Sequence, residues 1–177
     1  MRALIGAVAV FATLVAACSG GGGGAGTTTA ADETWRTATL RDVATGQDFR
    51  ISALQGKVVV IEAMGIWCIN CRQQQGEAQA ALARVNSHAV VYISLDVDPN
   101  ERAQDLAEYA RREGFGWRFV VAPPEVSRSL AAAFGDQILS PPATPLVVLG
   151  PEGEVIEKHI GIKSAADLAA LLEEHLP

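Results

Sequence analysis

Residues 58–71, VVVIEAMGIWCINC, place two cysteines shortly after a run of aliphatic residues. The run at 58–63 is interrupted only by Glu62, which is typical of a strand buried on both faces of a sheet. Helical character follows over residues 71–85. The stretch therefore predicts a strand, a short turn and a helix, with the cysteine pair where the helix begins.

The spacing of the two cysteines favours a redox-active pair. Two intervening residues in the first helical turn bring both sulfurs within bonding distance. Cys68 would lie at the helix N-terminus, where free N–H groups and the helix dipole stabilise a thiolate. Because the thiolate is the attacking species, we predict that Cys68 is the nucleophile. Cys71, one turn further and more buried, would stay protonated and resolve the mixed disulfide.

The remaining apolar runs predict an α/β domain that begins with a β-hairpin and continues in the order β-α-β-α-β-α-β-β-α. Strands joined through helices pair in parallel, and the closing hairpin adds antiparallel strands. The sheet should therefore be mixed, with helices on both faces. The expected strands are 37–42, 48–51, 58–63, 89–97, 119–121, 146–149 and 155–160, and the expected helices are 71–85, 98–113, 125–134 and one that is capped by Ser164.

Two of these helices have start signals in the sequence. Asp98 as N-cap, Pro99 at the first helical position and Glu101 at the third predict the start of one helix. Gly114 should end that helix. Ser164, with an acidic residue three positions on, should cap the last helix.

The sequence resembles the thioredoxin superfamily at two places. Residues 67–71, WCINC, follow a hydrophobic strand as the active-site motif of that family does, and residues 143–145, ATP, precede a second apolar strand as its cis-proline loop does. The segment 49–71 resembles the TlpA/ResA-type extracytoplasmic branch, and the likeness covers residues 35–177. It implies a thioredoxin fold, with a mixed central sheet flanked by helices and an N-terminal β-hairpin.

The resemblance implies roles for four residues beside the cysteines. Pro145 would be cis, or alternatively a trans proline that opens a strand, and Thr144 would present its backbone to an extended substrate strand. Trp67 would contact substrate, or pack as a partly buried aromatic beside the site. Glu62 stands where thioredoxins carry a buried Asp, so a desolvated carboxyl group there would exchange a proton with Cys71. The alternative for Glu62 is a side chain turned to solvent.

Two positions depart from the family's pattern. Gly76 stands where the first active-site helix usually has a proline, and Gln74 stands where ResA-type proteins carry a glutamate. The glutamine removes one acid/base group, so the substrate specificity of the ResA type is not carried over. The dipeptide Ile69-Asn70 between the cysteines leaves the reduction potential unassigned.

The N-terminus has the features of a bacterial lipoprotein precursor. Arg2 precedes an apolar run, residues 3–15, that is short for a membrane span and fits a signal peptide. The run closes on small residues before Cys18 and resembles a lipobox, whose cysteine is acylated and becomes the first mature residue. An ordinary signal peptide with an incidental cysteine, or a short membrane anchor, is the alternative. The expected organisation is a signal peptide at 1–17, a lipidated Cys18 with a Gly-rich tether at 18–34, and one thioredoxin-like domain at 35–177.

Composition excludes several classes of protein. The chain has 20 acidic and 14 basic side chains and a formal net charge of -6, so it lacks the basic surface of a nucleic-acid-binding protein. Hydrophobic residues make up 49% of the chain, which supports a packed domain rather than a disordered one.

Together these features predict a lipid-anchored, extracytoplasmic thiol-disulfide oxidoreductase that acts on exported proteins, as a monomer and without a cofactor or bound metal. The branch resemblance favours a reductant in cytochrome c or copper-site maturation, with electrons from a membrane thiol carrier. The alternative is a Cu(I)-binding metallochaperone similar to SCO proteins, because a cysteine pair favours Cu(I). SCO proteins carry Cys-x3-Cys and a distant His, whereas the spacing here is two and the histidines read as surface or strand residues: His88, His159 and His175.

Overall fold

The computed structural model describes residues 33–85 and 87–177. Cys18, the predicted signal peptide and nearly all of the predicted tether lie outside these residues, so those predictions stand as predictions. Within the described part of the chain, no helix is long and apolar enough to cross a membrane.

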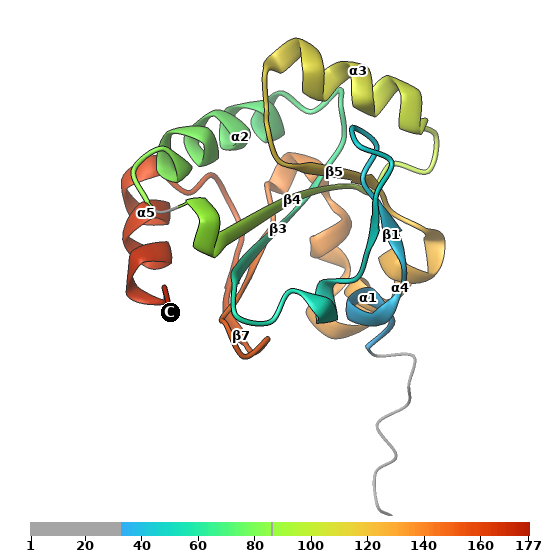
Figure 1. The fold of residues 1–177 in the computed structure, drawn as a ribbon. Helices are drawn as coiled ribbons and strands as arrows, with labels where there is room; N and C mark the ends of the chain where they lie inside the picture. The colour runs from blue at the N-terminus through green and yellow to red at the C-terminus, as the bar shows by residue number, and fades with distance from the viewer. Residues whose placement is uncertain (1–32, 86) are drawn as a thin grey trace, which may run out of the picture.

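A five-stranded mixed sheet forms the centre of the domain (Figure 1). Its strand order is β5-β4-β3-β6-β7, in which the first three strands run parallel and the last two are antiparallel to their neighbours. The strands are β3 (Val58–Met64), β4 (Val90–Asp96), β5 (Arg118–Val121), β6 (Leu146–Leu149) and β7 (Val155–His159). Every residue of β3 is buried, because the strand lies in the middle of the sheet with helices over both faces.

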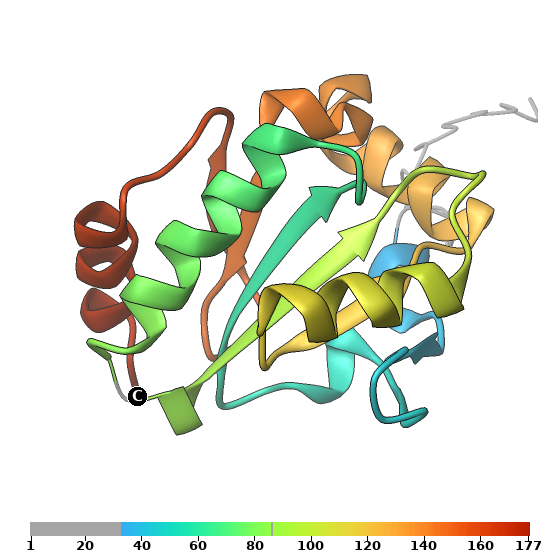
Figure 2. The same ribbon diagram turned by 90° about the horizontal axis from the view of Figure 1, so that it is seen from above.

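Helices cover both faces of this sheet (Figures 1 and 2). Alternate residues of β3 point to opposite faces, so Val58 and Val60 pack beneath α2 and α5, whereas Val59 and Ile61 pack with the side chains of α1 and α4. The helix α3 lies on the same face as α2. The helices are α1 (Thr34–Thr37), α2 (Ile69–Leu82), α3 (Ala103–Glu113), α4 (Pro124–Phe134) and α5 (Ala165–Glu174), with four short 3-10 helices at Ile51–Ala53, Ser87–Ala89, Asp136–Leu139 and Pro141–Ala143.

The predicted α/β architecture is confirmed, including the N-terminal hairpin, although its strands are short. They are β1 (Leu40–Arg41) and β2 (Asp48–Phe49), which pair antiparallel as a separate two-stranded sheet. The cap of the last helix is also confirmed, since the Ser164 side chain accepts a hydrogen bond from the Asp167 amide at 3.1 Å. The helix α1 is not among the predicted elements.

The predicted start of α3 is wrong, whereas its end at Gly114 is confirmed, in a left-handed conformation with φ 76°. The helix begins at Ala103 rather than after Asp98. Asp98 instead closes a tight turn, accepting a hydrogen bond from the Asn100 amide at 2.9 Å. The Glu101 side chain accepts the amide of Ile66, in a loop 35 residues away, rather than capping its own helix. Tertiary partners have replaced the local capping that the sequence pattern indicated.

Candidate active site

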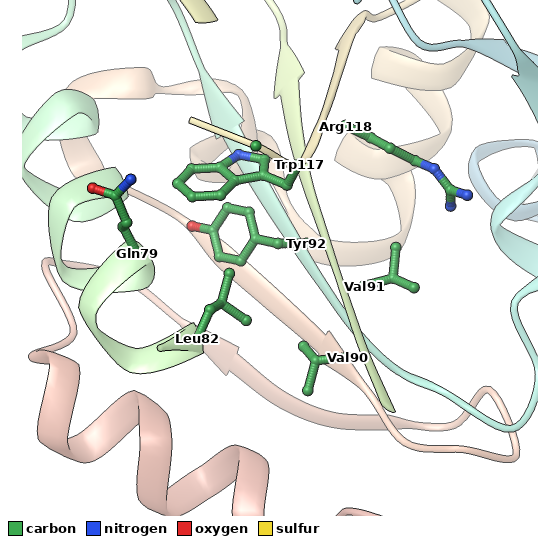
Figure 3. A pocket seen from close by; sticks show the side chains of 8 residues that line it. Gln79, Leu82, Val90, Val91, Tyr92, Trp117 and Arg118 are labelled. Atoms are coloured by element: carbon green, nitrogen blue, oxygen red, sulfur yellow. The ribbon is translucent and has the colours of Figure 1, made fainter. Parts of the chain in front are cut away.

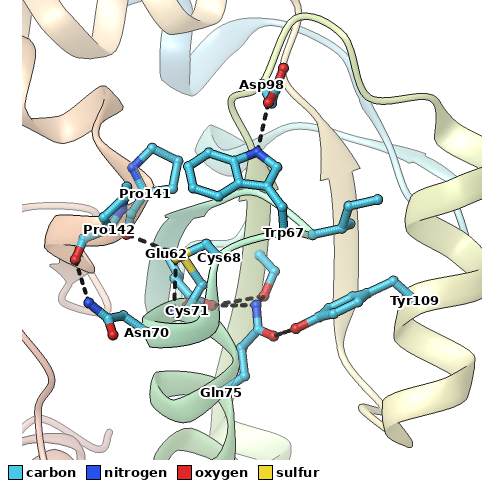
Figure 4. Close-up of a disulfide and its surroundings, with 12 residues drawn as sticks. Glu62, Trp67, Cys68, Asn70, Cys71, Gln75, Asp98, Tyr109, Pro141 and Pro142 are labelled. Atoms are coloured by element: carbon cyan, nitrogen blue, oxygen red, sulfur yellow. Dashed lines mark hydrogen bonds between the residues drawn. A yellow bond between two sulfur atoms is a disulfide. The ribbon is translucent and has the colours of Figure 1, made fainter.

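The two cysteines of the Cys-x-x-Cys motif form a disulfide at the start of α2, as the sequence predicts (Figure 4). Their Cα atoms lie 5.2 Å apart. Cys68 is the N-cap residue of the helix, and its Sγ accepts a hydrogen bond from the Cys71 amide at 3.0 Å. An N-cap acceptor at the positive end of the helix dipole is well placed to hold negative charge, so a reduced Cys68 would be stabilised as the thiolate.

The two sulfurs differ in access. Cys68 is only 4% exposed but lines two surface hollows, whereas Cys71 is fully buried and lines neither. The Cys71 sulfur lies 3.2 Å from the backbone oxygen of Pro141, to which a reduced thiol would donate a hydrogen bond. That carbonyl acceptor favours the protonated form of Cys71. The geometry therefore supports attack at Cys68 and a protonated, resolving Cys71.

One of the hollows is an apolar groove of about 280 Å³ between Cys68 and the loop that precedes β6. It is lined by Trp67, Cys68, Ile69, Asn70 and Pro142. Trp67 and Ile69 are 55% and 76% exposed, which is unusual for large apolar side chains. Asn70 Nδ2 donates a hydrogen bond to the Pro142 oxygen at 2.9 Å and so ties the groove's two sides together. The predicted contact residue Trp67 is thus available to a partner.

The indole of Trp67 is held from the other side of the site by Asp98. Its Nε1 donates a hydrogen bond to Asp98 Oδ2 at 2.8 Å (Figure 4). The Asn100 amide and the Trp67 indole both donate to the Asp98 carboxylate and lower its pKa below the ordinary range. Sequence reasoning assigned Asp98 to a helix cap and missed this role.

Glu62 is fully buried in the middle of β3, so the alternative of a solvent-facing side chain is wrong. Its Oε2 accepts hydrogen bonds from Ser94 Oγ at 3.0 Å, Gln75 Nε2 at 3.1 Å and the Tyr92 hydroxyl at 3.3 Å. Its Oε1 is buried and has no partner among the described residues. Burial raises the pKa of Glu62 to about 8, and the three hydrogen bonds offset only part of that shift.

The network around Glu62 reaches α2 and α3. Gln75 lies one helical turn after Cys71, and its Oε1 accepts a hydrogen bond from the Tyr109 hydroxyl at 2.6 Å (Figure 4). Ser94 also accepts a hydrogen bond from the Trp117 indole at 2.9 Å. The carboxyl group is therefore linked to the helix that carries the resolving cysteine. None of these polar partners was singled out from the sequence, because they lie 13 to 55 positions away from Glu62.

A further hollow lies away from the cysteines, beside α2 (Figure 3). It has a volume of about 370 Å³, and Tyr92 and Trp117 form its inner wall. Neither cysteine lines it. Since both aromatic residues belong to the Glu62 network, they separate this hollow from the buried carboxyl group.

The loop before β6 differs from the prediction. The Thr144–Pro145 peptide bond is trans, and no described peptide bond is cis, so the predicted cis Pro145 is wrong. The chain changes direction through Thr144, which adopts the left-handed conformation with φ 46° and ψ 57°. Its amide donates to the Pro141 oxygen at 2.8 Å, and the Ala63 amide donates to the Pro145 oxygen at 3.3 Å. These bonds fix the loop against β3 beside the disulfide.

The two departures from the family pattern have structural explanations. Gln74 is buried, and its side chain accepts from the Lys163 amide at 2.7 Å and donates to the Lys163 oxygen at 3.4 Å. These two hydrogen bonds hold α2 against the segment that leads into α5. Gly76 is exposed inside α2, which continues through it without a break, and a Cβ there would meet nothing within 4 Å.

Comparison with solved structures identifies the fold. The chain is similar to a thiol:disulfide interchange protein of the thioredoxin family from Chlorobium tepidum, at 20% identity over 78% of this chain and 92% of that chain, with a TM-score of 0.61. The thioredoxin domain of a thiol-disulfide oxidoreductase from Bacteroides vulgatus matches at 15% identity over 78% and 92%, also with a TM-score of 0.61. The copper-bound ScoI of Arabidopsis thaliana matches at 16% identity over 77% and 94%, again with a TM-score of 0.61.

No protein-family model and no curated protein matches the sequence, so the likeness rests on structure. The three matches cover 77% to 78% of this chain. The chain has the thioredoxin fold.

Proposed function

We propose that the protein is a thiol-disulfide oxidoreductase that acts on exported proteins through the Cys68–Cys71 pair. The observation that carries the proposal is the disulfide at the N-terminus of α2, in which Cys68 lines an apolar surface groove and Cys71 is fully buried away from it. A disulfide that served only stability would not require this asymmetry. The thioredoxin fold around the pair supports the same reading.

In the reduced protein, the Cys68 thiolate attacks one sulfur of a substrate disulfide, and the substrate's S–S bond breaks. The released substrate thiolate takes up a proton, and Cys68 is left in a mixed disulfide. Cys71 then loses its proton and attacks the Cys68 sulfur, which releases the second substrate thiol. The substrate has gained two electrons and two protons, one of which comes from the solvent and one from Cys71. The protein has lost two electrons and the Cys71 proton, ending as the disulfide that the structure shows.

Glu62 is the proposed acceptor of the Cys71 proton. A pKa of about 8 is close to that of a thiol, so a proton passes between the two groups at little cost. The unpartnered Oε1 leaves one oxygen free for that exchange. Gln75, which touches both the Glu62 carboxyl and the Tyr109 hydroxyl, keeps the acid against the helix that carries Cys71.

The proposed setting is the cell envelope. Cys18 would be lipidated and anchor a monomeric domain to the membrane, from which a membrane thiol carrier would supply electrons. The proposed direction is reductive, towards the cysteines of exported cytochrome c or copper-site proteins. The sequence features at residues 1–34 and the TlpA/ResA resemblance support this part of the proposal.

A second candidate is a Cu(I)-binding role, because the copper-bound ScoI shares this fold. Among residues 33–85 and 87–177, no group of three or more His, Cys, Asp or Glu side chains is arranged to hold a metal. His159 lies on β7 beside Leu146, and its buried Nε2 has no hydrogen-bond partner among these residues. Titration of the reduced protein with Cu(I) distinguishes the candidates, since tight one-to-one binding that His159→Ala weakens would favour the copper role.

The reduction potential of the Cys68–Cys71 pair tests the proposed direction. We expect the full-length protein, equilibrated in thiol redox buffers, to have a potential near about −270 mV, the value of thioredoxin. A potential near about −120 mV, the value of a strong disulfide donor, would reverse the direction and make the protein an oxidant. A pair that no thiol buffer reduces would contradict the oxidoreductase role itself.

A further inference from the structure

The turn that leads into the active site, residues 65–67, is held by side chains of the loop that follows β4. The Ile66 amide donates a hydrogen bond to both carboxylate oxygens of Glu101, at 3.0 and 2.9 Å. Within the turn, the Cys68 amide donates to the Gly65 oxygen at 3.0 Å. The position of Cys68 therefore depends on where Glu101 holds the backbone two residues before it.

Glu101 is itself contacted by a second acid, Asp96, at the end of β4. Asp96 is fully buried, and its Oδ1 accepts a hydrogen bond from the Asp98 amide at 3.0 Å. Its Oδ2 is buried with no donor among the described residues, and the carboxyl group of Glu101 interacts with the Asp96 side chain. Two ionised carboxylates would repel each other here, so the contact requires that one proton is shared between them.

The surroundings favour keeping that proton on Asp96. The charged groups that act on it are Glu101 and Asp98, both from the loop that follows its own strand. Its neighbours across the sheet, Met64 of β3 and Val121 of β5, carry no charge. On the helix side, α3 contributes the apolar Leu106 to the cluster that contains Met64 and the disulfide.

Among the described residues, no basic side chain acts on Asp96 to offset this negative charge. Arg102, the base nearest in sequence, forms an exposed ion pair with Asp105 at 2.7 Å. Burial, followed by the contact with Glu101, raises the pKa of Asp96 to about 9. Asp96 is thus a neutral hydrogen-bond donor at neutral pH.

We propose that Asp96 and Glu101 are positioning residues that share one proton and hold the active-site turn in place for disulfide exchange at Cys68. Asp96 donates its proton to Glu101, and Glu101 accepts the Ile66 amide. Above the pH at which Asp96 ionises, the two carboxylates repel, Glu101 releases Ile66 and the turn loosens. This inference rests on the proposed function, because it concerns the same reaction.

The test follows the Ile66 amide by NMR in the oxidised full-length protein, where neither cysteine of the pair titrates. In the wild type, we expect the Ile66 proton shift to titrate in the alkaline range. In Asp96→Asn, the side-chain amide still donates to Glu101 but has no proton to lose, so the Ile66 shift should not titrate. Glu62→Gln should keep the transition, and Asp105→Asn is the matched control because its carboxylate is partly exposed and pairs with Arg102.

Kinetics supply the second readout. With dithiothreitol as the reductant and rates corrected for its thiolate, we expect Glu101→Ala to slow exchange about threefold to tenfold, since small displacements of a reacting group are costly. In Asp96→Asn, the side-chain amide has no proton to lose, so the exchange rate should lack the alkaline decline of the wild-type rate. If the wild type exchanges disulfides but the Ile66 shift titrates in the same way in Asp96→Asn, this inference is wrong and the proposed function stands. A wild type that exchanges no disulfide at any pH would overturn the proposed function.

Discussion

Replacing Cys68 with serine should reduce disulfide exchange to the uncatalysed background, a loss of at least about a thousandfold. A hydroxyl group cannot form the mixed disulfide, and Cys71 is buried and lines neither surface hollow. Replacing Cys71 with serine should have a different effect. Cys68 can still attack, but nothing resolves the product, so the protein should accumulate as a mixed disulfide with its substrate.

The measurement is the turnover of a protein disulfide, together with mass spectrometry of the adduct under non-reducing conditions. Both variants should be made with and without Cys18→Ala, because a free Cys18 thiol could form adducts of its own. If Cys68→Ser formed the stable adduct and Cys71→Ser did not, the assignment of nucleophile and resolving cysteine would be reversed.

The central sheet and its flanking helices could be predicted from the sequence, because the residues that specify each element lie within or next to it. The aliphatic run at 58–63 can be buried only between two layers, and it became the fully buried strand β3. The cysteine pair needed only a strand before it and a helix after it to reach a helix N-terminus. Gly114 and Ser164 end and begin their helices through bonds made within the helix itself.

The parts that could not be predicted depend on residues far apart in the chain. Asp98 and Glu101 have the pattern of a helix cap. In the structure, the Asp98 carboxylate accepts a hydrogen bond from the Trp67 indole, and the Glu101 carboxylate accepts the Ile66 amide. A single sequence does not show these hydrogen bonds, because they form only when the loops that follow β3 and β4 meet. The left-handed conformation of Thr144 is similar, since a β-branched residue before proline gives no local sign of it.

Only part of the polar network around Glu62 could be predicted from the sequence. A lone acid in an aliphatic strand predicts a perturbed carboxyl group, and the structure confirms the burial. Its donors come from α2 and β4, and their register against β3 could not be known in advance. Ser94 is the direct neighbour of Glu62 in the β3–β4 pairing, and Tyr92 lies two positions before it on the same face of β4.

The raised pKa of Glu62 also makes the stability of the fold depend on pH. Burial raises this pKa from 4.5 to about 8, so between these values the folded chain holds a proton that the unfolded chain has released. Stability therefore decreases as the pH rises through this window and stays reduced above pH 8. Asp96, with its pKa raised from 3.8 to about 9, contributes a slope of the same sign. The oxidised protein should be more stable at pH 5 than at pH 9.

Glu62→Gln should remove the Glu62 part of this slope and slow catalysis at the same time. The amide oxygen can accept the three hydrogen bonds that Oε2 now receives, and the amide nitrogen can occupy the place of the unpartnered Oε1. At pH 9 the variant should gain stability on the order of 4 kcal/mol relative to the wild type, with little change below pH 5. Without the proton acceptor, exchange should slow by about one to two orders of magnitude.

Denaturant unfolding at pH 5 and pH 9 and exchange rates on the same samples measure both effects. The control is Glu108→Gln on α3, where the side chain is exposed and should change neither quantity. A variant that lost stability and rate together at every pH would indicate a purely structural Glu62. A gain of alkaline stability with a loss of rate has one physical explanation, which is that the fold keeps a costly buried carboxyl group because that group takes up the proton of Cys71.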